Sequence, residues 1–489
     1  MASSHLTVPV DAMSPRRTKE EKFGMRVSRR GLISSAITLA TLTAAGSASG
    51  RVRQRRKPNF VFILADDLGA FDLSCYGRED YRTPYIDSIA RNGMRFDRGY
   101  ASSSSCAPTR VGLISGRYQN RLLAGSGEGG GYTRGKIGYS GDLPSLPGMF
   151  KAAGYRTGLV GKWGIGELPD YGPRKSGYDE FFGLMGGGID YWSHDFLDPL
   201  TPGPRHPDLY DNETPVKLDG YSTDLFSDRA SDFIMRNAKQ PFMLSLHYTA
   251  PHWPWQTRTE RGSPRMTDMH YEGGSPAIYR DMVLAMDQGI GRVLDTLRKH
   301  RLDRDTVIIF TSDNGGERFS KMWPLRGGKG DLWEGGTRVP LIVSWPGRIE
   351  AGTVSRQIAI SMDFLPTMAA LAGISTDPSF PPDGIDLSPQ LFGAPPIERT
   401  LFWMTPGDRL AALSYPWKFM RNGTLEYLYN LDEDPTEHAN FKTRNPAVFA
   451  DLKARTLAWS AQMQKPMPAV PRTLVDQAEG LETPRLPGK

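Results

Sequence analysis

The sequence predicts an α/β protein with a large, mostly parallel sheet flanked by helices and a smaller C-terminal α+β domain. Two patterns predict this class. Short runs of apolar, β-branched and aromatic residues each stop at a polar residue and a turn, which is typical of strands buried on both faces of a sheet. Helix-like segments lie between these runs, as the crossover connections of parallel strands require. The 489 residues are enough for a sizeable core, and we find no internal repeat.

The strands and helices are expected to alternate along the chain. Strands are predicted in NFVFILADDLG (59–69), YRTGLVGKWG (155–164), PFMLSLHYTAPHWP (241–254) and TVIIFTSDNGG (306–316). Helices are predicted in PYIDSIARNGM (84–94) and YRDMVLAMDQGIGRVLDTLRKH (279–300). A further helix is expected to begin near Cys106, because Pro108 suits a first helical turn.

Composition divides the chain into five parts. The main α/β domain is expected over 58–375 and a smaller sheet-plus-helix domain over 376–465, because the Pro-rich stretch STDPSFPP (375–382) marks a junction. The smaller domain contains the strand-like FMRNG and EYLYNL and a final helix in VFADLKARTLAWSAQM (448–463). Residues 466–489 hold five prolines and are expected to be an irregular tail. The two N-terminal parts are residues 1–50 and the basic arm 51–57.

Residues 1–50 have the pattern of an export signal. SRRGLI (28–33) is followed by a mildly apolar stretch that ends in small residues, and the paired Arg29-Arg30 resembles a bacterial twin-arginine signal peptide. This pattern predicts a bacterial protein that the twin-arginine export machinery carries, already folded, to the periplasm or the outside, with cleavage after Ala48 or Gly50. The alternative is a disordered basic leader.

Charge and hydrophobicity argue against two classes of partner, nucleic acids and membranes. Residues 1–50 carry seven Lys/Arg against three Asp/Glu and residues 51–57 add five positive charges, so the net charge of +6 leaves about −3 for residues 58–489. Such a body is not a basic nucleic-acid binder, and the arm is expected to be a solvated tail. No run reaches the roughly 18 apolar residues of a membrane span, so we expect no stable membrane insertion.

Polar residues follow four of the predicted strands. The carboxyl ends of parallel strands meet at one edge of a sheet, so we expect these residues to lie close together. They are Asp66-Asp67, Lys162, His252 and Asp313-Asn314. Carboxylate and amide oxygens suit hard cations such as Ca²⁺ or Mg²⁺. The alternative is that the acids only cap turns and helix starts.

The chain has two cysteines, and one stands in an unusual place for an exported protein. Cys106 follows four serines and precedes a Pro-Thr-Arg, at the start of a predicted helix where free N–H groups favour an anion. On composition alone a lone cysteine is more often a small buried apolar residue. The neighbouring Pro108 and Arg110 argue against that interpretation, whereas Cys75 is expected to be a packing residue.

CAPTRVGLISGR (106–117) resembles the signature of the type I sulfatases, which reads Cys, a small residue, Pro, Ser or Thr, Arg, then an apolar stretch that closes in Gly-Arg. The resemblance continues in family order through most of the chain. Its segments are PNFVFILADDLG, TPYIDSIARNGMRFDRGYA, GKWGIG, GYDEFFG, APHWP, SDNGG, LRGGKGDLWEGGTRVPLIVSWPG and LYNLDEDPTE. The resemblance implies the alkaline phosphatase-like fold and makes 58–375 the catalytic domain.

The resemblance also implies two cofactors. In that family the signature cysteine is oxidised by a formylglycine-generating enzyme to formylglycine, an aldehyde that hydrates to a diol, so Cys106 would be a modified residue. One Ca²⁺ per chain would be held by Asp66, Asp67, Asp313, Asn314 and the modified Cys106.

The remaining roles come from the same resemblance. Arg110 and Lys162 would hold the diol and the sulfate oxygens, Lys329 in RGGKG would bind sulfate near the leaving side, and Asp313 would accept the diol proton. His252 in APHWP would protonate the leaving alcohol, because imidazole titrates near neutral pH. The alternative for His252 is a structural role beside Trp253.

One position departs from the family pattern. The family frequently has a histidine after the tryptophan of the GKW motif, where it contacts the diol, and here Gly164 stands in its place. Either His194 or His247 substitutes for it, or expulsion of sulfate relies on Asp313. His247 lies inside an apolar run and is expected to be buried if it has no such role.

The sequence therefore predicts an exported, arylsulfatase-type enzyme that cleaves sulfate monoesters of a sulfated small molecule or glycan, more in keeping with a carbohydrate than with a simple aryl ester. Aromatic residues near the expected pocket favour sugar rings, although packing explains them equally well. They are Tyr191, Trp192, Trp253, Trp255 and Trp323. The alternatives are a phosphate or phosphonate ester hydrolase on the same scaffold and a non-catalytic binder of sulfated glycan. The Gly-rich GSGEGGG (125–131) is interpreted as a flexible loop, because no strand precedes it.

Overall fold

The computed structural model describes residues 57–126, 137–196, 206–261 and 273–467. The predicted signal peptide, nearly all of the basic arm, most of GSGEGGG and most of the Pro-rich tail lie outside the described residues. Among the described residues, no helix is both long and apolar enough to cross a membrane.

A ten-stranded sheet forms the centre of the main part of the chain, in the order β11-β2-β10-β9-β1-β8-β4-β5-β6-β7. Its middle five strands are parallel: β9 (Thr306–Ser312), β1 (Asn59–Ala65), β8 (Phe242–His247), β4 (Arg156–Lys162) and β5 (Glu180–Leu184). All four strands predicted from the sequence are among these five. The outer strands are β10 (Leu341–Ser344), β2 (Met94–Phe96), β11 (Thr353–Ser355), β6 (Tyr210–Asp211) and β7 (Thr214–Pro215), and β10 and β6 run antiparallel to the middle strands.

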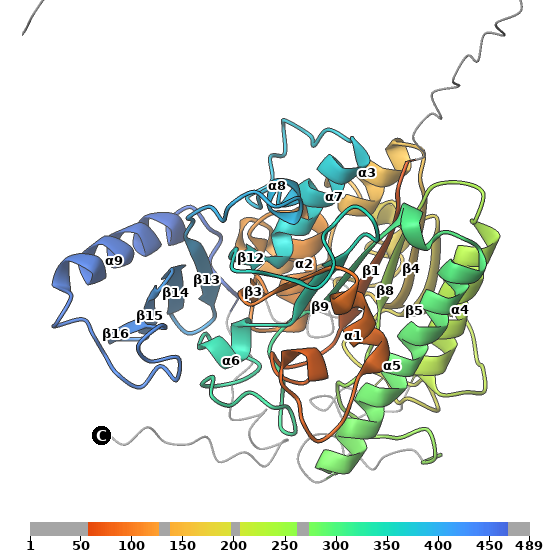
Figure 1. Cartoon of the computed structure of the whole chain (residues 1–489), viewed down its shortest axis with the longest axis horizontal. Coiled ribbons are helices and arrows are strands. Elements are labelled where there is room, and N and C mark those ends of the chain that lie inside the picture. Colours follow the sequence, from red (N-terminus) through yellow and green to blue (C-terminus); the bar gives the residue numbers. More distant parts are fainter. Residues whose placement is uncertain (1–56, 127–136, 197–205, 262–272, 468–489) are drawn as a thin grey trace, which may run out of the picture. The chain divides into compact units, whose positions relative to one another are not determined.

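Helices cover both faces of this sheet (Figure 1). Successive side chains of β1 point to opposite faces of the sheet, and both faces are apolar. Val61 and Ile63 belong to the apolar cluster on one face, and Phe60 and Phe62 belong to the cluster on the other. The first face packs against α1 (Pro84–Arg91), α4 (Ser222–Arg236) and α5 (Pro276–Lys299). The second face packs against α2 (Cys106–Ser115), α3 (Leu146–Ala152) and α7 (Phe364–Ala372). Crossover helices on both faces confirm the predicted α/β class.

A four-stranded antiparallel sheet follows near the C-terminus. Its strands are consecutive in the chain: β13 (Leu401–Thr405), β14 (Arg409–Ser414), β15 (Trp417–Asn422) and β16 (Leu425–Asn430). The last helix, α9 (Pro446–Ser460), packs on this sheet, where Leu452 joins a cluster with Phe419 and Leu428. The opposite face carries Trp403 and Tyr429, which pack with Tyr100 of β3 (Gly99–Tyr100). The predicted strands and helix of this region are confirmed.

Three short elements complete the fold. They are the two-stranded sheet of β3 and β12 (Ala359–Ile360) and the helices α6 (Glu334–Thr337) and α8 (Ser388–Leu391), of which β12 and α8 lie between the two larger sheets along the chain. The indole Nε1 of Trp403 donates to the Ala101 carbonyl at 2.8 Å. The C-terminal sheet is therefore attached to the segment that leads into α2 and Cys106.

Candidate active site

Two neighbouring strands deliver four polar side chains to one point. Ala65 at the end of β1 pairs with Ser312 at the end of β9, so Asp66-Asp67 and Asp313-Asn314 leave the sheet at the same height. All four side chains are buried. The Asp67 amide donates to Asp313 Oδ1 at 3.2 Å, and Asn314 Nδ2 donates to Asp67 Oδ1 at 2.6 Å. The structure thus brings together the oxygen ligands that the sequence predicts.

The backbone is strained at this point. Asp67 has φ of 64°, in the left-handed region that costs a non-glycine residue about 1 kcal/mol or more. The hydrogen bonds to Asp313 and Asn314 hold it there. Strain that the surrounding contacts maintain is typical of residues whose side chain must point in a defined direction.

The donor set fits a hard metal ion. Carboxylate oxygens of Asp66, Asp67 and Asp313 all lie within 4.8 Å of one another. Asp66 Oδ1 and Asn314 Oδ1 are buried and have no hydrogen-bond partner among the described residues. A buried oxygen without a partner is costly, and a bound cation would supply that partner. Oxygens alone, without thiolate, favour Ca²⁺ or Mg²⁺.

Burial and the mutual repulsion of the acids shift their pKa values apart. Burial and the neighbouring Asp313 raise the pKa of Asp66 well above its ordinary value. Burial raises the pKa of Asp67 to about 6 although Lys329 opposes it. Burial would also raise the pKa of Asp313, but the charges of Arg110 and Lys162 outweigh it and the net shift is downward.

Three cations neutralise these acids. Lys162 ends β4 and its Nζ lies 2.7 Å from Asp66 Oδ2, and Lys329 Nζ lies 2.7 Å from Asp67 Oδ2. The guanidinium of Arg110 binds Asp313 Oδ2 through Nε at 3.1 Å and Nη2 at 2.8 Å. Burial would lower the pKa of Lys162, but the negative charges around it, chiefly that of Asp66, together outweigh burial and the net shift is upward. Each cation is therefore charged and stands where an anion can bind.

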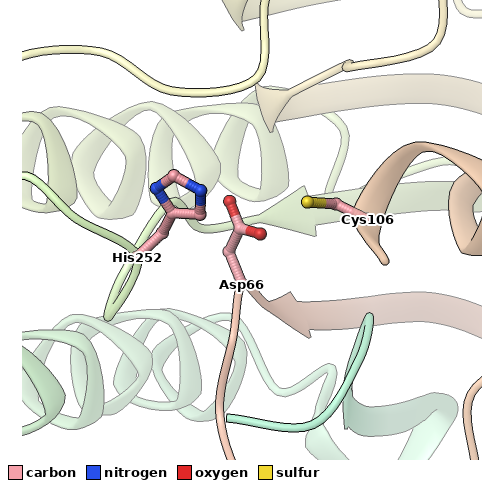
Figure 2. Close-up of side chains that lie close together, drawn as sticks. All are labelled: Asp66, Cys106 and His252. Atoms are coloured by element: carbon pink, nitrogen blue, oxygen red, sulfur yellow. The ribbon is translucent and has the colours of Figure 1, made fainter. Parts of the chain in front are cut away.

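Cys106 is the first residue of α2, after the N-cap Ser105. Its sulfur, a carboxylate oxygen of Asp66 and a ring nitrogen of His252 lie within 4.8 Å of one another. Figure 2 shows the Asp66 carboxylate between the Cys106 sulfur and the His252 ring. Desolvation raises the pKa of the Cys106 thiol to about 12, against the opposing charges of Lys162 and Lys329. At neutral pH it is a thiol and not a reactive thiolate, unlike the cysteines of thiol-dependent enzymes.

His252 follows β8 on a turn that Tyr191 holds, because the Tyr191 hydroxyl lies 2.9 Å from both the Thr249 and the His252 carbonyl oxygens. His252 Nδ1 makes a short hydrogen bond to the Trp253 carbonyl, and Nε2 lies 3.6 Å from Asp67 Oδ2. Because a carbonyl only accepts, Nδ1 carries the proton and Nε2 faces the acids. Burial and the charges of Lys329 and Lys162 hold the pKa of His252 well below its ordinary value.

The two histidines considered as substitutes at Gly164 lie in different places. His194 Nε2 donates to the Gly220 carbonyl at 3.0 Å, and within the described part of the chain none of its hydrogen bonds reaches the acids or cations above. His247 Nδ1 lies 3.2 Å from the Lys162 carbonyl and 3.4 Å from Arg110 Nη1. Burial and the charge of Arg110 lower the pKa of His247 to about 3, so it is neutral. Of the two, only His247 contacts this group of residues.

Gly164 has φ of 70°, a conformation that L side chains rarely adopt. A Cβ at this position would lie 3.3 Å from Lys162 Cε and 3.5 Å from Arg110 Cδ. A side chain there would therefore point at the same two cations. Both substitutes and the role of Asp313 remain predictions.

Sequence reasoning missed one charged residue of the site. Glu317 Oε1 lies 3.1 Å from Lys329 Nζ, which also binds Asp67. Its only signal was an acid three residues after Asn314 in the same loop. An acid at that position indicates a role in the site only once the fold is known to place Lys329 beside it.

The chain is similar to known proteins in sequence and in structure. The protein-family model described as "Sulfatase" matches residues 58–374. N-acetylgalactosamine-6-sulfatase of Canis lupus familiaris is 33% identical over 398 residues, which are 77% of this chain and 73% of that protein. Among solved structures, Ps i-CgsB superposes with a TM-score of 0.76 and 28% identity over 88% of this chain and 98% of its own, and it is also known in complex with k-i-k-neocarrahexaose.

A further solved structure shows the fold alone. The phosphonate monoester hydrolase of Agrobacterium radiobacter superposes with a TM-score of 0.58 at 20% identity and covers 83% of this chain and 96% of its own. These neighbours identify the architecture of a ten-stranded mixed sheet with a small C-terminal sheet as the alkaline phosphatase-like fold.

Proposed function

Because the chain belongs to the sulfatase family, we propose that this sulfuric ester hydrolase cleaves sulfate monoesters of a carbohydrate, with a formylglycine made from Cys106 and one bound Ca²⁺. The observation that carries the proposal is the convergence of Cys106, Asp66 and three cations at one point of the sheet edge. Acids for a metal ion, cations for an anionic ester and a residue for modification are all present there.

The calcium ion would be held by the oxygen donors and by the modified residue. These are Asp66, Asp67, Asp313, Asn314 and the modified Cys106. The buried Oδ1 atoms of Asp66 and Asn314, which have no hydrogen-bond partner among the described residues, support this assignment. When bound, the ion supplies positive charge that offsets the charge of the sulfate oxygens.

The protein's own residues orient the reactants. Formylglycine, when hydrated, supplies an oxygen nucleophile that the protonated thiol of Cys106 does not. Arg110 Nη2 lies 3.8 Å and Lys162 Nζ 2.7 Å from the carboxylate of Asp66, which also lies near the Cys106 sulfur, so both cations are placed to bind sulfate oxygens there. Asp313 keeps a lowered pKa and so is ionised and able to accept a proton.

His252 is placed to assist the leaving group. Its Nδ1 is fixed by the Trp253 carbonyl, so Nε2 is the atom that faces the acids and exchanges a proton there. Lys329 lies on the same side, because it shares Asp67 with His252. We propose that binding of the anionic sulfate raises the pKa of His252 so that Nε2 takes up a proton, which it then gives to the departing alcohol, and that Lys329 binds the sulfate beside it.

The charge of the site favours sulfate over phosphate. Among the described residues, four carboxylates (Asp66, Asp67, Asp313 and Glu317) face three cations (Arg110, Lys162 and Lys329). With all four carboxylates ionised, a bound divalent ion would turn this deficit into one positive charge, which the single negative charge of a sulfate monoester would neutralise. A phosphate monoester carries nearly two negative charges at pH 7 and leaves an excess. Hydrolysis rates of a sulfate and a phosphate ester of one alcohol distinguish the two substrates.

Two observations support a carbohydrate substrate. The solved relative Ps i-CgsB is known with a bound neocarrahexaose, and the canine relative is named for an amino sugar sulfate. Of the five aromatic residues considered from the sequence, Trp323 is 73% exposed, so its ring is accessible to a ligand, whereas Tyr191, Trp253 and Trp255 are buried in the fold. Packing thus explains those three.

A Cys106→Ala variant tests the proposal. We expect hydrolysis of 4-nitrophenyl sulfate to fall by several orders of magnitude, about 10³-fold or more, because the nucleophile is absent. Cys75→Ala is the matched control, since Cys75 lies outside the site and packs beside the first core cluster. Retained turnover in Cys106→Ala would refute the mechanism. Binding of a sulfated glycan by wild-type protein with no release of sulfate would favour the non-catalytic alternative.

Maturation and export belong to the same proposal. Modification of Cys106 needs a formylglycine-generating enzyme as a partner, and the twin-arginine pattern of residues 28–33 supports export of the folded chain to the periplasm or the outside. Detection of the protein, shortened by the signal peptide, in a periplasmic fraction, and its loss from that fraction when Arg29 and Arg30 are replaced by lysine, tests the export route.

A further inference from the structure

Lys329 is carried by a segment with no helix or strand of its own. The segment, residues 325–333 (the Lys329 loop), lies between β9 and α6. Gly327 and Gly330 flank the lysine with φ of 73° and 85°. Glycines in this conformation leave the backbone free to move, so the position of Lys329 depends on contacts made from outside the loop.

One side of the loop is attached to the site. The Lys329 amide donates to the Gly316 carbonyl at 3.1 Å, and the Gly330 amide donates to the Ser104 carbonyl at 2.7 Å. Gly316 follows the acids at the end of β9, and Ser104 precedes Cys106. These bonds hold the loop over the acids. They do not involve its outer side, which is the side that contacts the C-terminal sheet.

The C-terminal sheet supports that outer side. Arg409, the first residue of β14, donates from Nη1 to the Gly330 carbonyl at 3.0 Å, and its Nε donates to the Pro406 carbonyl at 2.9 Å. Arg326 of the loop donates from Nη1 to the Glu437 carbonyl at 2.8 Å. The residue next to Lys329 and the beginning of the loop are thus both bound by residues from beyond position 400.

A buried charge cluster fixes the end of the loop. Lys418 of β15 lies 2.9 Å from Glu334 Oε1 and 2.9 Å from Glu437 Oε1, and the Glu334 amide donates to Glu437 Oε2 at 2.7 Å. The three side chains are at most 1% exposed. Tyr100 donates from its hydroxyl to Glu334 Oε2 at 2.9 Å. Glu334 follows the loop directly, so this cluster, Lys418–Glu334–Glu437, sets where the loop ends.

We infer that Arg409 and the Lys418–Glu334–Glu437 cluster are positioning residues for Lys329, so that the C-terminal sheet holds the Lys329 loop in register with the active site. The inference rests on the role proposed for Lys329 in sulfate binding. Arg409 touches the loop backbone and acts through Lys329. Displacement of a binding group by about 1 Å lowers a rate by up to about 100-fold, so loss of this contact is expected to be measurable.

A double-mutant cycle tests the coupling. It compares kcat/KM for 4-nitrophenyl sulfate in the wild type, Arg409→Ala, Lys329→Ala and the double variant. We expect Arg409→Ala to lower kcat/KM by about 10- to 100-fold in the wild type and by less than about twofold in Lys329→Ala. Lys453→Ala is the matched control, because Lys453 of α9 binds Glu426 of β16 and not the Lys329 loop. It is expected to change kcat/KM by less than about twofold.

Hydrogen exchange provides a readout that does not depend on turnover. In Arg409→Ala the amides of residues 326–333 are expected to exchange faster, while those of β13–β16 keep their protection. Equal losses of activity in the two backgrounds, or unchanged exchange in the loop, would overturn the inference. A wild type inactive on all sulfate esters would refute the proposed function instead, and the exchange result would still decide whether the C-terminal sheet holds the loop.

Discussion

The buried lysine of the C-terminal sheet allows the sharpest prediction about stability. Lys418 is fully buried and pairs at 2.9 Å with both Glu334 and Glu437. Replacement by methionine keeps the apolar part of the side chain but removes the charge. Two buried carboxylates are then left without their cation, which costs about 3–5 kcal/mol of unfolding free energy. For a chain of this size the apparent Tm is expected to fall by about 3–5 °C.

The dependence on pH makes this prediction specific. Burial raises the pKa of Glu437 to about 7, against the opposing charge of Lys418 and with the help of Glu334. Removal of Lys418 raises it further. A carboxyl whose pKa is higher in the folded state stabilises the fold below its unfolded value near 4.5, and that stability is lost as pH rises through the folded value. The deficit of Lys418→Met should therefore be smallest near pH 4.5 and largest above pH 7.

Urea unfolding at pH 4.5 and 7.5 measures both quantities. Lys453→Met is the control, because Lys453 of α9 is 37% exposed and pairs with Glu426 of β16 at 2.7 Å. This variant should lose less than about 1 kcal/mol of unfolding free energy at either pH. A loss for Lys418→Met as small as that of Lys453→Met, or a deficit that does not shrink at pH 4.5, would refute the account of the buried cluster.

Three further predictions concern the site and its surroundings. A chelator should lower the Tm of the protein, and Ca²⁺ at about 100 times its Kd should raise the free energy of unfolding by about 2.7 kcal/mol. An Asp66→Asn variant that kept the full calcium response would contradict the assigned ligands. His252→Ala should reduce hydrolysis more for sulfates of weakly acidic alcohols than for 4-nitrophenyl sulfate, because acidic leaving groups need less protonation, and equal losses in kcat would contradict that role. Burial raises the pKa of Asp208 to about 7 although the Gly186 and Met185 amides oppose it, so this residue should make the fold less stable as pH rises from about 4 to 7, by at most about 4 kcal/mol. Asp208→Asn should lack this part of the pH dependence, and parallel stability curves for variant and wild type would disprove it.

The sequence predicted the parts of the fold that strong local patterns encode. β1 and β9 are continuous runs of seven buried residues, so their length, their burial and the acids that follow them are visible in the sequence. β6, β7 and β12 have two residues each, which is too short for any periodicity to appear. They exist because the neighbouring strand offers free hydrogen-bonding groups, which only the fold reveals.

In the site, too, local patterns predicted some residues, while contacts made across the fold were not visible in the sequence. Cys106 and the four oxygen donors lie on strand ends or at a helix start, where sequence reasoning expects function. Glu317 and Arg409 were not predicted, since each acts through a contact with the Lys329 loop made across the fold. The burial that lowers the pKa of His252 could not be anticipated either, because it depends on how the surrounding segments pack.

The mass of the tryptic peptide Gly99–Arg110, taken from protein produced in its natural host, tests the central claim most directly. The peptide contains Cys106 and no other cysteine. Oxidation of the thiol to the aldehyde lightens it by about the mass of one water molecule, and we predict that the lighter peptide predominates. A peptide of unchanged mass, with a free thiol in folded and exported protein, would contradict the claim that this site works through a formylglycine.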